Sequence, residues 1–434
     1  MTNSVGASDP PLPTDVPRRR WVRIIPVLVV TYMISYVDRT NVALALDPQI
    51  STMMRDLAMT DSLKGLAAGI FFLSYFSLQV PGGHWGQHWS AKKLITICLV
   101  VWGFSAMACG FAQTFGQFVF FRLMLGLGES SVFPAMTVLL AHWFPRSERV
   151  RANAYWQLCL PLAIVLSAPF TGWCLGAFGW RAMLVIEGAL PLIWLPIWWL
   201  CISDHPAKAK WISPEERAFL ETRFEQERTG SEQASPMPIW RVLMLPAIPV
   251  MIAIAFLAYS SLNGCMIFFT STLKEGKFSA VQYSVLFALP YLLTMLVMIL
   301  TSWNSDRTGE RRGHIAVVLA VSGASLVVSV ALHGHFWLSY AFLCLAIPGP
   351  FAFVPALFAI PSEALPRHAT GAIVGLVNGV GGIGGFVGPF FVGWLSQIFH
   401  GVAVPFVVLG IGMLVAAALA FLLPKSRHEA NERA

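Results

Sequence analysis

Twelve long apolar stretches dominate this sequence and limit what the chain can fold into. Each one is long enough to cross about 30 Å of hydrocarbon as a helix that rises 1.5 Å per residue. The stretches cover approximately residues 22–46, 63–85, 94–112, 117–141, 152–176, 182–202, 242–270, 280–303, 314–333, 337–361, 370–398 and 402–423. This pattern predicts an all-α membrane protein with twelve transmembrane helices.

The composition agrees with a chain embedded in a lipid bilayer. Of its 434 residues, 56% are hydrophobic and only 12% are charged, whereas soluble proteins are about 25% charged. The net charge of +7 would fit a nucleic-acid partner, but the basic residues are scattered through short loops and form no stripe. The seven cysteines lie in apolar segments without a C-x-x-C pair, so we expect core residues and neither a metal site nor a cofactor.

Lysine and arginine are distributed unevenly between the two sets of loops. With the N-terminus inside, the cytoplasmic side receives Arg18, Arg19, Arg20, Arg23, Lys92, Lys93, Arg146, Arg149, Arg151, Arg307, Arg311, Arg312, Arg367, Lys425, Arg427 and Arg433. The outer loops hold only Arg55, Lys64, Arg181, Lys274 and Lys277. Because positive loops stay inside, both termini are predicted to be cytoplasmic. No N-x-[ST] sequon occurs, which favours a bacterial inner membrane.

A polar segment at 203–241 divides the chain into two halves of six helices each. Ser213-Pro214-Glu215-Glu216 combines an N-cap, a proline at the first helical position and a capping-box glutamate, so a surface helix should follow. The predicted domains are a disordered cytoplasmic tail (1–20), an N-terminal bundle (21–202), a cytoplasmic linker with an amphipathic helix (203–241), a C-terminal bundle (242–424) and a second cytoplasmic tail (425–434).

The two halves also resemble one another in sequence. Pro145 and Trp173 are separated by the same number of residues as Pro366 and Trp394, with similar residues before each tryptophan. Repeated halves imply two pseudo-symmetric six-helix bundles with a binding site where they meet, near the middle of the membrane.

Two charges in the fourth stretch, Arg122 and Glu129, are costly to insert and are therefore candidates for a function. They are seven residues apart and share one helix face, on which Gly126 lets a partner helix approach closely. One interpretation is a structural ion pair between them. The other is that Glu129 gains and loses a proton while the nearby Arg122 favours its carboxylate form.

Asp38 and Arg39 lie inside the first stretch. Adjacent residues point about 100° apart on a helix, so one should face the centre and the other a neighbouring helix. Arg39 is the first choice to hold an anionic substrate, since its planar fork matches a carboxylate; an interhelical clamp is the alternative. Asn378, in the glycine-rich eleventh stretch, is a candidate substrate contact, and Glu187 is expected at the membrane interface.

Several motifs together resemble the major facilitator superfamily, specifically its anion:cation symporter family. They are Tyr36-x-Asp38-Arg39-x-Asn41, Tyr75 with Pro81-Gly82-Gly83, Arg122-x-x-x-Gly126-x-x-Glu129, Phe133-Pro134, Trp143-Phe144-Pro145 and Asn378 with the glycines after it. The resemblance implies the major facilitator fold, proton-linked acids at Asp38 and Glu129, and substrate binding by Arg39. Tyr36, Tyr75, Asn378 and Arg122 complete the predicted substrate site.

The loop pattern of that superfamily is only partly present. After the eighth stretch it is kept, which assigns a gating role to Asp306, Arg307 and Arg311; after the second stretch Gln87-His88 stands where Asp-Arg is expected. Leu160 occupies a position where sugar-acid members of the family place a glutamine, so this chain is more similar to the phthalate, tartrate and hydroxyphenylacetate branch.

The sequence therefore predicts a monomeric, proton-coupled symporter that imports a small organic carboxylate by alternating access between its two bundles. No pattern of catalytic residues is recognisable, so an enzyme is not expected. Two alternatives stay open: a proton-coupled antiporter that exports organic compounds, and a nontransporting sensor of the same fold. The partners expected are the anion, protons and the lipid bilayer.

Overall fold

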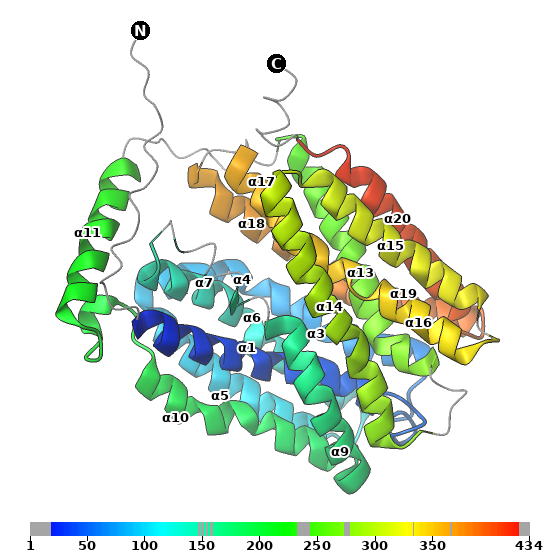
Figure 1. Cartoon of the computed structure of the whole chain (residues 1–434). Helices are drawn as coiled ribbons and strands as arrows, with labels where there is room; N and C mark the ends of the chain where they lie inside the picture. Colours follow the sequence, from blue (N-terminus) through cyan, green and yellow to red (C-terminus); the bar gives the residue numbers. More distant parts are fainter. Residues whose placement is uncertain are drawn as a thin grey trace.

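A computed structural model describes residues 19–145, 148, 152, 155–156, 159–231, 244–272, 278–332, 334–364 and 367–424. Within these ranges the chain is helical and contains no strand. Figure 1 shows two groups of helices, one formed by α1 to α10 and the other by α13 to α20. The predicted all-α fold is confirmed.

The first group is built from helices that are interrupted at several points. They are α1 (Arg19–Ala45), α2 (Met53–Asp56), α3 (Asp61–Ser77), α4 (Gln79–Trp85), a π-helical turn (Gly86–Ser90), α5 (Ala91–Gly110), α6 (Phe115–Ser130), α7 (Val132–Trp143), α9 (Cys159–Gly188) and α10 (Leu190–Cys201). Ser90 has an extended backbone (φ −171°) and its hydroxyl accepts from the Lys93 N–H, which marks the corner before α5.

The second group follows a short 3₁₀ turn (Pro206–Lys208) and the linker helix α11 (Pro214–Ser231). It consists of α13 (Ala247–Thr272), α14 (Ala280–Thr308), α15 (Arg312–Ala331), α16 (Phe336–Ala346), α17 (Gly349–Ala364), α18 (Arg367–Gly382), α19 (Gly384–Ile398) and α20 (Ala403–Ala420).

Ten stretches in the described ranges are long and apolar enough to cross a membrane. One of them, Cys159–Cys201, contains two crossings, because Gly179 adopts φ 78° and folds α9 back on itself. A left-handed φ of this kind strains any residue with a Cβ atom. The pair α3 and α4 provides a further crossing that a break at Leu78 divides. The twelve predicted helices are therefore present.

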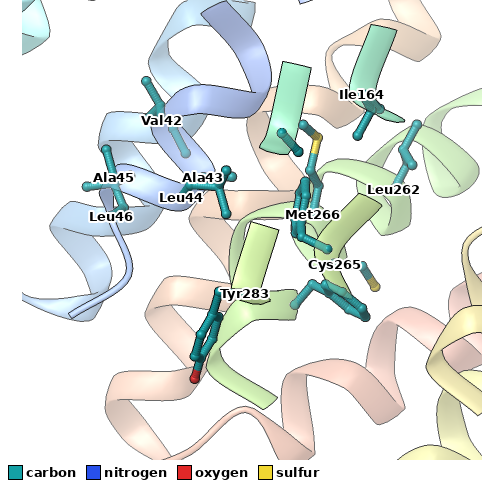
Figure 2. Packing of buried hydrophobic residues seen from close by; sticks show 14 of the residues in the cluster. Val42, Ala43, Leu44, Ala45, Leu46, Ile164, Leu262, Cys265, Met266 and Tyr283 are labelled. Atoms are coloured by element: carbon teal, nitrogen blue, oxygen red, sulfur yellow. The ribbon is translucent and has the colours of Figure 1, made fainter. Parts of the chain in front are cut away.

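The two groups share one apolar core at one end and have separate cores at the other. Val42 to Leu46, at the end of α1 and just after it, pack in a single cluster with Leu262 and Met266 of α13 and Tyr283 of α14. Figure 2 shows this shared cluster at close range. At the opposite end, which carries α11, Ile24 belongs to one cluster and Ile248 to another. The groups are thus joined at the end far from α11.

The most extensive contacts between the groups are those of α3 with α19 and of α9 with α14. Glycines permit the first contact: a Cβ atom on Gly69 would lie 2.8 Å from the Phe386 carbonyl oxygen, and one on Gly385 would lie 2.8 Å from the Phe72 ring. The glycine-rich eleventh crossing therefore serves close packing, since only residues without a side chain let two backbones approach this far.

The linker helix α11 begins at Pro214, as the sequence predicted, and lies beside the start of α1 (Figure 1). The Glu216 N–H donates to the Ser213 hydroxyl at 3.2 Å. The Glu216 carboxylate does not complete the capping box. It accepts instead from Arg20 Nη1 at 2.6 Å, while Arg20 Nη2 reaches both carboxylate oxygens of Glu148 at 2.7 and 2.9 Å.

We expect Arg20→Met to lower the melting temperature of the purified protein strongly. The three charged side chains of this cluster are almost fully buried. Removing the cation leaves Glu148 and Glu216 without a cationic partner among the described residues, at a cost of about 3–5 kcal/mol. A thermal-shift measurement in detergent checks this, with Arg19→Ala as the control, because Arg19 contributes only its backbone N–H to Glu216. Equal melting temperatures for both variants would contradict the role given to Arg20.

Candidate functional site

A buried ion pair joins α1 to α6 in the interior of the first group. Arg39 Nη2 lies 3.0 Å from Glu129 Oε2. The Ser35 hydroxyl donates to the same carboxylate oxygen at 2.6 Å. The Glu129 side chain is fully buried and that of Arg39 is 9% exposed. Low dielectric strengthens such a pair and also makes either charge costly without its partner.

Four aromatic rings surround the Arg39 guanidinium. Its Cζ atom lies 4.5, 4.9, 5.3 and 5.8 Å from the ring centroids of Tyr75, Tyr36, Phe71 and Tyr32. Guanidinium groups bind aromatic faces favourably because they are weakly hydrated and planar. The structure therefore brings Tyr36 and Tyr75, both predicted in the substrate site, to Arg39.

Asp38 faces away from this cage toward α5. Its carboxylate accepts from Trp102 Nε1 at 2.5 Å and from Asn41 Nδ2 at 3.4 Å. Its side chain is buried, since the residue is only 2% exposed. The two adjacent charges thus serve different surfaces, as helix geometry requires.

Arg122 does not pair with the acid on its own helix. Its Nη1 donates to the backbone carbonyl of Asp38 at 3.1 Å, and its Cζ lies 5.0 Å from the Phe71 ring centroid. The ion pair that the sequence suggested between Arg122 and Glu129 is replaced by the pair of Arg39 with Glu129. Gly126 lies against the backbone of α3 at Phe71, which is the close approach expected of it.

Asn378 lies on α18 in the second group and accepts a hydrogen bond from the Tyr259 hydroxyl at 3.3 Å. One turn later, Gly382 is packed directly against the ring of Phe76, the residue after Tyr75. This contact places the helix of Asn378 against the helix that carries part of the aromatic cage.

The predicted gating residues lie in the last turn of α14 and in the loop after it. Arg311 Nη1 donates to the Ser305 hydroxyl at 2.9 Å, and Arg307 is exposed, with its Cζ 5.6 Å from the Trp303 ring centroid. The side chain of Asp306 lies outside the described residues. Where the motif is degraded, the rings of His84 in α4 and His88 in the π-helical turn stack with their centroids 4.0 Å apart.

Glu187, which the sequence predicts at the membrane interface, is completely buried inside the first group. Its carboxylate accepts from Asn41 Nδ2 at 2.9 Å and from the Thr171 hydroxyl at 2.6 Å. The fold at Gly179 sets Thr171 of the preceding arm beside Glu187, a burial that position along one helix does not indicate. The polar residues Asn41 and Thr171 inside apolar stretches were the available signal.

Comparisons with known proteins agree with this architecture. The model of the Major Facilitator Superfamily matches residues 28–389. A protein of Agrobacterium vitis named "Putative tartrate transporter" is 30% identical over 96% of this chain and 92% of its own length. A "Quinolone resistance transporter" of Acinetobacter baumannii is 28% identical over 94% and 95%, respectively. The crystal structure of a bacterial homologue of the human lysosomal transporter Spinster, inward-facing and occupied, has a TM-score of 0.74 at 17% identity and covers 94% of this chain and 97% of that one.

Proposed function

The chain belongs to the Major Facilitator Superfamily, and on that premise we propose that it is a proton-coupled symporter that imports a small organic carboxylate. The observation that carries the proposal is the pair of Arg39 with Glu129 inside the aromatic cage. The Glu129 carboxylate binds the Arg39 guanidinium in the way a substrate carboxylate would. The two anions therefore compete for one cation. Protonation of Glu129 removes its charge and leaves Arg39 for the substrate.

This competition gives a coupling mechanism. In the outward-facing state Glu129 and Asp38 carry protons, and an organic anion binds Arg39 with contacts from Tyr36, Tyr75 and Asn378. Arg122 holds the α1 backbone at Asp38 and so keeps Arg39 in position. After the bundles rock, substrate and protons leave and Glu129 pairs with Arg39 again. With a monoanion, two protons would move one net charge, which is worth about 2.3 kcal/mol per 100 mV of membrane potential.

The uneven distribution of lysine and arginine supports a topology with both termini cytoplasmic, in a bacterial inner membrane. In that orientation the shared core lies on the outer side and the separate cores face the cytoplasm. On that assignment the structure corresponds to an inward-facing arrangement in which Glu129 pairs with Arg39. Arg307, Arg311 and Asp306 would act at the cytoplasmic side when the bundles close there.

Export of an organic compound is the second candidate, which the name of the Acinetobacter baumannii relative favours. An uptake measurement in proteoliposomes with an imposed inward proton gradient distinguishes import from export. We expect tartrate or a related carboxylate to accumulate inside, and this accumulation to disappear when a protonophore is added. Accumulation of a quinolone only with the opposite gradient would establish export, and specific binding without flux would indicate a sensor.

A further inference from the structure

Glu187, to which the transport cycle above gives no part, is linked to Asp38 through a single side chain. Asn41 Nδ2 donates to Glu187 Oε2 at 2.9 Å and to Asp38 Oδ1 at 3.4 Å. We propose that Glu187 is an additional proton-binding acid of the first group, coupled to Asp38 by Asn41, and that it takes up and releases a proton in each transport cycle. The inference rests on the proposed function, since it adds a proton site to the same carrier.

The first support is the lack of a compensating cation at a completely buried carboxyl group. Glu187 is 0% exposed, and in the described part of the chain no lysine, arginine or histidine forms an ion pair with it. Its two oxygens are occupied by the neutral donors Asn41 and Thr171. A carboxylate in this setting is strongly disfavoured relative to the neutral acid, because burial of an unpaired charge is costly.

The second support is a shortage of donors around Asn41. The amide nitrogen donates to two carboxyl groups, while Asn41 Oδ1 is fully buried and has no hydrogen-bond donor among the described residues. A proton on Glu187 supplies an O–H donor, and a rotation of the Asn41 amide brings its orphaned oxygen to that donor. Without the proton, this network holds a buried oxygen that lacks a donor among the described residues.

The third support is the position of Glu187 on a helix that contacts the other group. Its carboxyl group bonds Thr171 on the first arm of α9, and it lies on the second arm, beyond the fold at Gly179. The helix α9 packs against α14 of the other group. A change of charge at Glu187 thus alters the contacts of a helix that lies at the interface between the two groups.

The neighbouring titratable groups are consistent with coupling to Asp38. Asp38 on α1 shares the Asn41 amide nitrogen with Glu187, and Cys174 lies on the same arm of α9 as Thr171. From α5, Ala106 packs beside Gly188 and carries no charge. The cation of this region, Arg122 on α6, donates to the Asp38 backbone carbonyl at 3.1 Å. Two acids that share one donor titrate as a pair, so a proton on Glu187 favours the carboxylate of Asp38.

Infrared difference spectroscopy of the full-length protein in lipid vesicles tests whether Glu187 is protonated, and it requires no substrate. We expect the wild type to show the carbonyl stretching band of a protonated, buried carboxylic acid, and Glu187→Gln to lose it. The band should shift in Thr171→Val, which removes one of its donors. Glu216→Gln is the matched control: it removes a buried carboxylate that already has a cationic partner, so the band should stay. A band unchanged in Glu187→Gln would overturn the proposal.

Proton-driven accumulation tests whether the proton is exchanged during the cycle. Tartrate is the probe, in proteoliposomes with an imposed gradient of one pH unit. Each coupled proton contributes about a tenfold accumulation per pH unit, so Glu187→Gln should accumulate about tenfold less than the wild type. Equal accumulation by Glu187→Gln and by the wild type would show that Glu187 exchanges no proton during the cycle. If the wild type transports no carboxylate in this assay, the proposed function fails, while the infrared band still decides whether Glu187 carries a proton.

Discussion

Replacement of Glu129 by glutamine is expected to abolish proton-driven accumulation while leaving substrate exchange intact. Glutamine mimics the protonated acid, so Arg39 is permanently free for the substrate. Substrate binding then no longer requires a proton at Glu129, and proton binding at the other acids is no longer linked to it. With one pH unit across the membrane, each coupled proton supplies about 1.4 kcal/mol, or a tenfold accumulation. The variant should show no accumulation that depends on the gradient. Tartrate uptake and tartrate counterflow in proteoliposomes measure the two properties separately.

Ser35→Ala is the matched control for this experiment. It removes the hydroxyl that donates to Glu129 Oε2 at 2.6 Å but keeps the acid and its pair with Arg39. The lost hydrogen bond is worth about 1–3 kcal/mol, so affinity or rate can change while coupling persists. Gradient-driven accumulation in Glu129→Gln equal to that of the wild type would remove Glu129 from the coupling role.

Arg39→Ala is expected to weaken substrate binding by about 30-fold or more. Truncating one partner of a buried charge pair costs about 2–5 kcal/mol, and the four rings around the guanidinium lose their cation at the same time. Arg39→Lys should be almost as damaging, because the lysine keeps the charge but loses the planar fork that fits a carboxylate. Isothermal titration of the purified protein with tartrate measures both affinities.

Arg23→Ala is the control, because Arg23 is an exposed cation on the same helix that stacks over Trp211 outside the site. We expect its substrate affinity to match that of the wild type. Binding that survives in Arg39→Ala would exclude Arg39 as the anion site. A parallel loss in Arg23→Ala would mean that the effect arises from the stability of α1 and not from the site.

Much of the fold could be predicted because it depends on local properties of the chain. The apolar stretches, the linker helix after Ser213 and the close packing at Gly126 each follow from composition or spacing within a few residues. The breaks inside helices were harder to predict. The reversal at Gly179 was predicted only as a loop between two stretches, because one left-handed glycine inside a helical run leaves no periodic signal.

The candidate site was only partly predictable. The cost of charge in hydrocarbon singled out Asp38, Arg39, Arg122 and Glu129 from the sequence. This cost could not show which charged side chains form ion pairs, because side chains that are distant in the sequence meet only after the helices pack. Glu129 was matched with the arginine nearest in sequence, whereas its partner lies 90 residues away on α1.

By itself, the sequence determined that this chain crosses a membrane as repeated helical halves and that a few buried charges would matter. Both conclusions rest on transfer of side chains from water to hydrocarbon, which each segment experiences on its own. The tertiary structure alone decided which acid neutralises Arg39 and that Glu187 lies buried without a cation among the described residues. Both outcomes depend on which helix faces contact one another, and this is decided by the simultaneous packing of many residues.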